Sequence, residues 1–276
     1  MEKWFEEKLE VEEGRVLKVR YKKLLKSVKS VFQKIDVYET DAFGKMLVHD
    51  EVIMLTEFDE SHYHEMIVHP ALLTHPNPEK VLIIGGGDGG TMREVLKHKE
   101  VKEAHLCEID KMVVDVCKEF FPNLSKSFDD KRAKLFFEDG AKFVEQRKDY
   151  YDVIIVDSSD PIGPAEVLFQ EKFYNDMFNS LKDDGIVITQ SESFIYHKDI
   201  IENIASFSKR IFPYYSYYYT LVPTYPSGLI GFSFCSKKYD PLKDLNEERI
   251  KDLGNLKYYN KGIHYSAFNL PNSWKF

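Results

Sequence analysis

An apolar run that leads directly into a cluster of glycines is the feature that most restricts how this chain can fold. Residues 81–84 are apolar, residues 85–90 read Gly-Gly-Gly-Asp-Gly-Gly, and a helical pattern follows. Glycine is needed where backbone turns sharply or approaches a ligand closely, and a helix beyond the turn begins with free N–H groups. The stretch therefore predicts a strand, a tight turn and a helix that together cradle a nucleotide-like ligand.

The spacing of these glycines does not identify the ligand by itself. Gly85, Gly87 and Gly90 fit the G-x-G-x-x-G pattern of dinucleotide-binding proteins, so an NAD-dependent oxidoreductase is one interpretation. Asp88 argues against it, because a carboxylate inside the turn would lie where the diphosphate of a dinucleotide binds. A cationic nucleoside without phosphate, such as a sulfonium nucleoside, suits Asp88 better.

The pattern of apolar residues changes near Pro76 and Pro78. Before this point, alternating apolar and charged residues predict short antiparallel strands, followed by a helix at residues 61–73. After it, short apolar runs alternate with amphipathic segments, which predicts an α/β fold with a mostly parallel sheet and helices on both faces. We expect a small antiparallel β domain at residues 1–60, a linking helix and boundary at 61–78, and a Rossmann-like catalytic domain at 79–276.

Five apolar runs are expected to form the parallel strands of the larger domain. They lie at residues 81–84, 104–107, 135–137, 153–156 and 186–188. Amphipathic patterns at 111–121 and 169–181 predict two of the intervening helices. Two further β-rich stretches, at 214–220 and 229–235, predict an antiparallel hairpin at the edge of the sheet.

Composition excludes several classes of protein. No apolar run approaches the ~20 residues of a membrane span, and residues 1–7 lack the pattern of a signal peptide, so we expect a soluble cytoplasmic protein. A net charge of -8 argues against nucleic acid as a partner. The three cysteines, Cys107, Cys117 and Cys235, form no closely spaced pair, which predicts buried thiols rather than disulfides or a zinc site.

Acidic residues follow four of the five predicted parallel strands. They are, in chain order, Asp88, Glu108, Asp110, Asp139, Asp157 and Asp160. The carboxyl ends of parallel strands meet at one edge of a sheet, and α/β proteins bind their ligands there. So many carboxylates in one crevice repel each other unless a cation neutralises them. The arrangement therefore predicts a positively charged substrate.

Each of these acids also has a simpler interpretation. Asp110 directly precedes a helical stretch and is expected to cap it, and Asp139 with Gly140 fits a helix cap as well as it fits the edge of an adenine ring. Glu108 stands where an acid commonly binds both hydroxyls of an adenosine ribose. Asp157 and Asp160 could cap turns, but together with the other strand-end acids we favour a catalytic loop.

Four motifs, in the same order from about Gly14 to the C-terminus, resemble the polyamine aminopropyltransferases, spermidine synthases above all. They are residues 63–66, 85–90, 157–161 and 223–228. The resemblance implies a Rossmann-like, methyltransferase-like domain preceded by a small β domain. It implies transfer of an aminopropyl group from decarboxylated S-adenosylmethionine to putrescine, giving spermidine and methylthioadenosine. It also implies a homodimer or homotetramer, with no metal and no cofactor besides this co-substrate.

The same resemblance implies roles for individual residues. Asp157 would be the base, Asp160 would bind the distant amine, and Tyr63 and Tyr225 would shape the amine channel. Asp88 would hold the amino end of the aminopropyl group. The full set implied for the donor is Gln33, His64, Gly85, Gly87, Asp88, Glu108, Asp139 and Gly140.

Two residues depart from the usual pattern of the family. Met54 stands where a glutamine often faces the amine channel, and Glu51 stands where a glycine is common. An apolar Met54 leaves agmatine, cadaverine or spermidine open as the acceptor in place of putrescine. A non-catalytic sensor of nucleosides or polyamines with the same fold is a further alternative.

Overall fold

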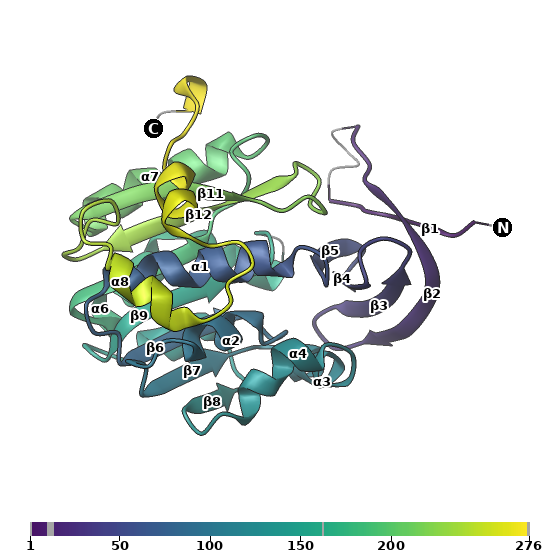
Figure 1. Ribbon diagram of the computed structural model, residues 1–276, viewed down its shortest axis with the longest axis horizontal. Helices are drawn as coiled ribbons and strands as arrows, with labels where there is room; N and C mark the ends of the chain where they lie inside the picture. The colour runs from purple at the N-terminus through teal and green to yellow at the C-terminus, as the bar shows by residue number, and fades with distance from the viewer. Residues whose placement is uncertain (1, 10–13, 162, 275–276) are drawn as a thin grey trace.

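The structure, a computed structural model, describes residues 2–9, 14–161 and 163–274. Within these residues the chain forms a small antiparallel sheet near the N-terminus and a larger mixed sheet covered by helices, and the two stand side by side (Figure 1). The outer limits of the two expected domains, Met1 and Phe276, lie outside the described residues. The strands of the small sheet lie between residues 4 and 56, and those of the larger sheet between residues 80 and 236.

The small sheet contains five strands that pair in sequence order, each antiparallel to the next. They are β1 (Trp4–Glu6), β2 (Lys18–Lys29), β3 (Lys34–Thr40), β4 (Lys45–His49) and β5 (Val52–Thr56). Asp50 and Glu51 form the two-residue turn between β4 and β5, with φ of 45° and 67°. A turn of this kind favours glycine, so Glu51 occupies an exposed, strained backbone position.

Helix α1 (Glu60–Thr74) confirms the predicted helix and extends it by one residue at each end. It is buried on nearly all sides and lies across one face of the larger sheet (Figure 1). The carboxylate of Glu65 accepts hydrogen bonds from the backbone N–H groups of Lys257, Tyr258 and Tyr259. These bonds fasten the C-terminal segment onto α1, which fixes the helix from the side opposite the sheet.

The larger sheet confirms the expected mostly parallel fold with an antiparallel hairpin at one edge. Its order is β11-β12-β10-β9-β6-β7-β8, and β12 alone runs opposite to the other strands, so that its pairs with β10 and β11 are antiparallel while the remaining pairs are parallel. The strands are β6 (Lys80–Gly85), β7 (Glu103–Cys107), β8 (Ala133–Phe136), β9 (Tyr151–Asp157), β10 (Leu181–Gln190), β11 (Tyr214–Leu221) and β12 (Leu229–Ser236).

Most of the observed strands are longer than the predicted runs, and one predicted run extends past the end of its strand. The run at 135–137 was expected to be a strand, but β8 begins at Ala133 and ends at Phe136. Cys107 is the last residue of β7 and pairs with Phe136, so Phe137 has no residue of β7 to pair with. Phe137 is accordingly exposed.

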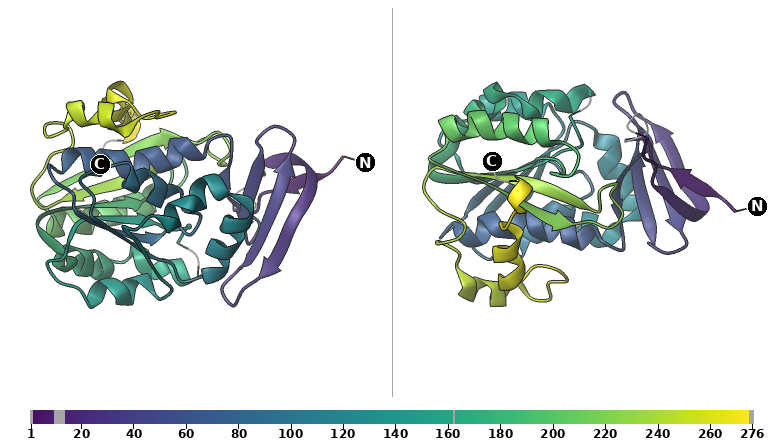
Figure 2. Two further views of the ribbon diagram at one scale, coloured as in Figure 1. Left: turned by 60° about the horizontal axis from the view of Figure 1, so that its bottom comes forward. Right: turned by 90° about the horizontal axis from the view of Figure 1, so that it is seen from above.

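Alternate side chains of the central strands pack on opposite faces of the sheet, as expected for strands between two layers of helices. Val81 and Ile83 of β6 join a core with α1 and α2 (Gly90–Leu96), whereas Leu82 and Ile84 join a core with the helices of the other face. Figure 2 shows the sheet between these layers. The helices of the second face are α5 (Gly140–Glu145), α6 (Glu171–Ser180) and α7 (Lys198–Ile211).

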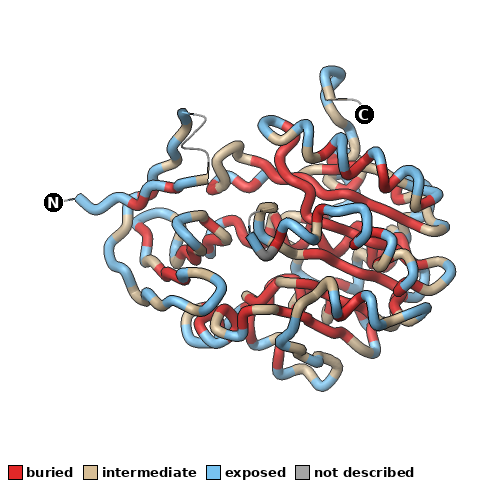
Figure 3. Tube along the Cα trace, turned by 180° about the vertical axis from the view of Figure 1, so that it is seen from behind, coloured by how far each residue is buried: buried red, intermediate tan, exposed pale blue. Residues whose placement is uncertain are grey.

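The small sheet packs against two helices of the larger domain. Helices α3 (Lys111–Phe120) and α4 (Pro122–Ser125) contribute Val113, Val116 and Leu124 to a core shared with Ile35 and Leu47. The strands of the small sheet therefore stand next to the carboxyl ends of β6 and β7. Figure 3 shows that buried residues concentrate in the central strands of the larger sheet, while the outer strands of the small sheet are largely exposed.

Shorter segments complete the fold. They are α8 (Glu247–Ile250), α9 (Lys261–Ala267) and the 3-10 helices Lys126–Asp129, Gly163–Phe169, Lys251–Leu253 and Asn272–Trp274. The three cysteines are free and buried, as expected. In the described residues, no helix combines the length and the apolar character that a membrane crossing requires.

Candidate active site

A cavity of about 450 Å³ lies where the carboxyl ends of β6, β7 and β9 face the small sheet. This volume is within the range of small-molecule sites. All twelve residues that the sequence predicts for the site line it: Gln33, Tyr63, His64, Gly85, Gly87, Asp88, Glu108, Asp139, Gly140, Asp157, Asp160 and Tyr225. The structure therefore brings five of the six strand-end acids together, all except Asp110, as the topology of a parallel sheet predicts.

The glycine turn allows β6 to end in close contact with β9. Gly85 has φ of +80°, and a Cβ atom there would lie 2.1 Å from the carbonyl oxygen of Asp157. Gly86 donates its N–H to the same oxygen at 3.0 Å. Asp88 is held inside the turn by the N–H of Gly90, which lies 2.7 Å from Oδ1. The turn therefore fixes Asp88 and Asp157 on one wall of the cavity.

Asp157 stands at the end of β9 with both carboxylate oxygens engaged. Tyr63 Oη donates to Oδ1 at 2.8 Å, and Thr91 Oγ1 donates to Oδ2 at 2.6 Å. Burial raises the pKa of Asp157, and the negative charge of Asp88 raises it further. The hydrogen bonds orient the carboxylate, while the raised pKa makes it a better proton acceptor.

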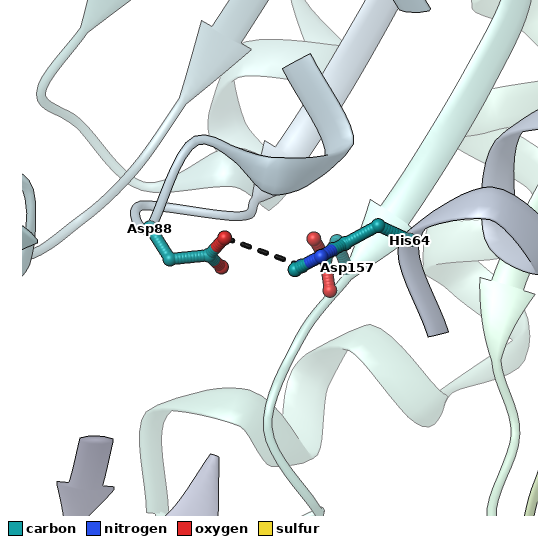
Figure 4. A group of neighbouring side chains, drawn as sticks. All are labelled: His64, Asp88 and Asp157. Atoms are coloured by element: carbon teal, nitrogen blue, oxygen red, sulfur yellow. Dashed lines mark ion pairs between the residues drawn. The ribbon is translucent and has the colours of Figure 1, made fainter. Parts of the chain in front are cut away.

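His64 from α1 reaches Asp88 across the cavity wall. Its Nε2 lies 3.2 Å from Asp88 Oδ1, and its Nδ1 lies 2.8 Å from Glu60 Oε2. Burial alone would lower the pKa of His64, but Asp88 and Glu60 outweigh it and raise the pKa to about 10. His64 is therefore an imidazolium at neutral pH. Figure 4 shows the side chains of His64, Asp88 and Asp157 converging, with the ion pair dashed.

The same three side chains form a site for a positive charge. One ligand atom each from His64, Asp88 and Asp157 lies within 4.8 Å of the others, close enough to surround an ammonium group when Nε2 of His64 carries no proton. A second group of this kind, His75, Asp152 and Asp184, lies away from the cavity. There Lys182 Nζ, 2.7 Å from Asp152 Oδ1, already supplies a cation.

The acids at the second and third strand ends have distinct environments. Burial raises the pKa of Glu108 to about 7, so this carboxyl group changes charge near neutral pH. Asp110 caps α3 by accepting from the N–H of Met112, as predicted. Asp139 caps α5 through the N–H groups of Ala141 and Lys142, which confirms the cap interpretation while its side chain still lines the cavity.

A smaller pocket of about 60 Å³ continues from the cavity beyond Asp160. It is lined by Asp160 together with the buried acids Glu7 and Glu192. Burial raises the pKa of Asp160 well above its usual value, and Glu192 raises it further. Glu192 also has φ of 62°, a conformation that is uncommon for a side chain other than glycine and often marks a functional position.

Aromatic side chains wall the passage between the two acid groups. The rings of Tyr63 and Tyr225 lie 6.3 Å apart in an edge-to-face arrangement. Tyr225 Oη donates to the carbonyl oxygen of Met54 at 2.7 Å. Met54 lines both pockets. Gln33 lines the larger cavity and donates to Asp110 Oδ2 at 3.1 Å. The passage is thus lined by aromatic and apolar side chains between two groups of acidic residues.

Known protein families match both the segment with the small sheet and the segment with the larger sheet. Residues 60–247 match the spermine/spermidine synthase domain, and residues 3–57 match the spermidine synthase tetramerisation domain. This chain belongs to the spermine/spermidine synthase family. It is accordingly an aminopropyltransferase of the spermidine synthase type, as the motifs predicted.

Similar proteins of this family cover nearly the whole chain. A polyamine aminopropyltransferase of Leptospira biflexa is 53% identical over 271 residues, which are 98% of this chain and 96% of the relative. Spermidine synthase 2 of Arabidopsis thaliana is 46% identical over 278 residues, 97% of this chain and 82% of the relative.

Solved structures of spermidine synthases are also similar to this chain over nearly its whole length. A spermidine synthase in complex with the transition state analogue AdoDATO is 39% identical, with a TM-score of 0.95 over 98% of this chain and 93% of the other. The spermidine synthase of Thermotoga maritima is 38% identical, with a TM-score of 0.92 over 98% of this chain and 92% of the other. The predicted Rossmann-like fold with a small antiparallel N-terminal sheet is therefore confirmed.

Some residues at the site were not predicted from the sequence, and Glu192, Glu60 and Thr91 show why. Glu192 lies two residues beyond the end of β10, so the rule that located the other strand-end acids could have found it. Glu60 lies four residues before His64, which is the spacing of neighbours on a helix, but the predicted helix began one residue too late. Nothing in the sequence pattern distinguishes Thr91, whose contact with Asp157 depends on how α2 packs.

Proposed function

We propose that this enzyme transfers the aminopropyl group of decarboxylated S-adenosylmethionine to putrescine, giving spermidine and methylthioadenosine. The observation that supports the proposal most strongly is the convergence of Asp88 and Asp157 on one wall of a nucleoside-sized cavity. Two carboxylates there suit a donor that brings a sulfonium and an ammonium, with no phosphate. A similar solved spermidine synthase binds the transition state analogue AdoDATO.

The donor would bind along the strand ends of β6, β7 and β8. Glu108 accepts hydrogen bonds from the ribose hydroxyls, Asp139 and Gly140 face the adenine, and Gln33 and His64 complete the nucleoside site. Gly85 and Gly87 allow the ligand to approach the backbone closely. Asp88 binds the aminopropyl ammonium and repels the carboxylate of ordinary S-adenosylmethionine, which provides selectivity for the decarboxylated donor.

The chemistry is a single in-line displacement. The neutral amine of the acceptor attacks the carbon next to the sulfonium, a C–N bond forms, and the C–S bond breaks with its electron pair remaining on the thioether. Positioning of the two substrates supplies much of the rate. No covalent enzyme intermediate is required.

The proton of the attacking amine passes to Asp157. An alkylammonium with a pKa near 10.4 lies about six units above an ordinary aspartate, a gap of roughly 9 kcal/mol. Burial raises the pKa of Asp157, which narrows this gap from the side of the base. The apolar surroundings of Tyr63 and Tyr225 disfavour the charged amine, which narrows it from the other side.

The acceptor would lie in the passage between the two acid groups. Its attacking nitrogen faces Asp157, and its second nitrogen stays protonated at Asp160, where Glu192 adds a further negative charge. Tyr63 and Tyr225 contact the methylene chain. Met54 contributes an apolar surface at the same place, so agmatine, cadaverine and spermidine are the competing acceptors to be tested against putrescine.

We also propose that different segments of the chain have different functions. Residues 1–60 form an assembly domain, 61–78 link it to the rest, and 79–276 carry the catalytic chemistry in a cytoplasmic homodimer or homotetramer. The exposed apolar side chains of Trp4, Leu24 and Val31 on the small sheet support an assembly role. Light scattering of the purified protein measures the oligomeric state, and a monomer would contradict this part of the proposal.

Product analysis tests the proposed reaction. The enzyme is incubated with decarboxylated S-adenosylmethionine and putrescine, and the products are measured by mass spectrometry. We expect equal amounts of spermidine and methylthioadenosine, and no product with ordinary S-adenosylmethionine. Binding of both substrates without formation of methylthioadenosine would instead indicate a non-catalytic sensor.

A further inference from the structure

A buried ion pair stands directly behind His64. Arg93 from α2 donates to both oxygens of Glu60, from Nη2 to Oε2 at 2.8 Å and from Nη1 to Oε1 at 3.2 Å. Glu60 Oε2 is also the partner of His64 Nδ1 at 2.8 Å. Arg93 is anchored in turn by Glu94, whose Oε1 accepts from Nε at 2.7 Å. The partner of Nδ1 is therefore an ionised and immobilised carboxylate.

The imidazole ring has little freedom to turn. A Cβ atom on Gly90 would lie 2.2 Å from Cε1 of His64, so the ring rests directly on the backbone of the glycine turn. With Nδ1–H directed at Glu60, the opposite nitrogen must face Asp88, where it lies 3.2 Å from Oδ1. The N–H of Gly90 occupies the same oxygen.

This geometry places two cations in competition for one carboxylate. The charged groups that face His64 are Glu60 from α1, Asp88 from the glycine turn, Arg93 from α2 and Asp157 from β9. In the free enzyme the Nε2–H group binds Asp88, which is also the residue that would receive the aminopropyl ammonium. Two adjacent cations repel each other strongly away from water. Loss of the Nε2 proton removes the repulsion and turns Nε2 into an acceptor for an ammonium N–H.

We propose that Glu60 and Arg93 are positioning residues that hold His64 so that the donor's aminopropyl ammonium replaces the Nε2 proton at Asp88, with one proton released to solvent for each donor bound. The inference rests on the proposed identity of the donor. Charge and atoms balance, since the imidazolium becomes a neutral imidazole that keeps its Nδ1–H, the proton passes to buffer, and the donor keeps its three ammonium hydrogens.

Calorimetry counts the protons. Donor binding is measured at about pH 8.5 in buffers of different ionisation enthalpy, where Glu108, with a pKa of about 7, is ionised and His64, with a pKa of about 10, is still charged. We expect release of about one proton with decarboxylated S-adenosylmethionine. Methylthioadenosine, which has no aminopropyl ammonium, is expected to bind without proton release.

Variants of His64 and Glu60 test whether the released proton comes from His64. In His64→Gln the amide can still accept from the ammonium, so the donor should bind without releasing a proton. In Glu60→Gln the acceptor for Nδ1–H is kept but its negative charge is lost, which lowers the pKa of His64 and reduces the count. His62→Gln is the matched control, because His62 is a half-buried residue of the same helix that contacts Leu221 and should leave the count unchanged.

The outcomes separate this inference from the proposed function. If the wild-type enzyme binds the donor without proton release, or if His64→Gln releases the same proton, the inference is wrong while the proposed donor stands. Equal release with methylthioadenosine would also overturn it. If the wild-type enzyme does not bind the donor at all, the proposed function itself is wrong.

Discussion

Tyr63 and Asp157 are joined by a hydrogen bond of 2.8 Å from the phenol to Oδ1, which ties α1 to the end of β9 inside the cavity. Because Thr91 holds the other carboxylate oxygen, the orientation of Asp157 is set from two different helices. The carboxylate can therefore meet a substrate amine without first rearranging.

Replacing Tyr63 by phenylalanine tests this orientation. A hydrogen bond to a charged group contributes about 1.5–3 kcal/mol, so Tyr63→Phe should lower kcat about tenfold or more. The lost bond favoured the ionised form of Asp157, so its pKa should rise and the acid limb of the kcat/KM profile should move to higher pH. Tyr214→Phe, at an exposed tyrosine of β11, is the control. An unchanged pH profile in Tyr63→Phe would contradict the predicted contact.

Asp157 and Asp160 are predicted to act at different steps. Asp157→Asn removes the proton acceptor and should chiefly lower kcat, whereas Asp160→Asn removes the partner of the distant ammonium and should chiefly raise KM for the amine. Steady-state kinetics with the acceptor varied measures both effects. Small and equal losses in the two variants would reject the assignment of base and anchor.

Met54 is predicted to influence the choice of acceptor. Its side chain lines the passage, so Met54→Gln places an amide where cadaverine would bury its extra methylene. One methylene contributes about 1 kcal/mol, so the ratio of kcat/KM for putrescine over cadaverine should rise about fivefold. Met54→Leu keeps an apolar surface and serves as the control. A ratio that moves equally in both variants would show that polarity at this position does not select the acceptor.

The charge on His64 should make stability depend on pH. Its pKa is raised from 6.5 to about 10 in the folded protein, so its contribution is fully present below about pH 6.5 and is lost as the pH rises toward 10. The difference in Tm between the wild-type protein and His64→Gln should therefore shrink over this window. Thermal unfolding followed by circular dichroism measures it.

The contribution of Glu60 to stability should depend on pH in the opposite direction to that of His64. Burial would raise its pKa, but His64 and Arg93 outweigh burial and lower it to about 2. Its contribution is present above about pH 4.5 and is lost as the pH falls toward 2. The Tm difference for Glu60→Gln should thus be constant between about pH 5 and 6 and decline as the pH falls toward 2, with a further decline in alkali only where His64 loses its proton. A decline on the alkaline side for Glu60→Gln alone would contradict the assignment.

Sequence reasoning located the strand-end acids because a parallel sheet leaves no choice about where its carboxyl ends lie. Asp88 and Asp157 each follow a buried apolar run, and adjacent parallel strands bring such positions to one edge. The rule requires only that the strands be recognised. For the same reason it would have reached Glu192, had it been applied to the fifth strand.

The partners of these acids could not be found in the same way. The contact between His64 and Asp88 depends on how α1 is rotated over the glycine turn, which the packing of the whole helix decides. Asp139 could not be assigned from the sequence because a cap and a ligand contact use the same residue at the same place, and the structure shows the cap. Phe137 was misplaced because the length of β8 is set by its neighbour β7.

A competition between acceptors tests the central claim most directly. Decarboxylated S-adenosylmethionine is supplied with equal concentrations of isotopically labelled putrescine and unlabelled cadaverine, agmatine and spermidine, so that the spermidine formed from putrescine differs in mass from the spermidine added. Each aminopropylated product is measured by mass spectrometry at low conversion. We predict that spermidine formed from putrescine is the main product, with methylthioadenosine equal to the sum of all products. A different main product would contradict the proposed acceptor, and the absence of methylthioadenosine would contradict aminopropyl transfer.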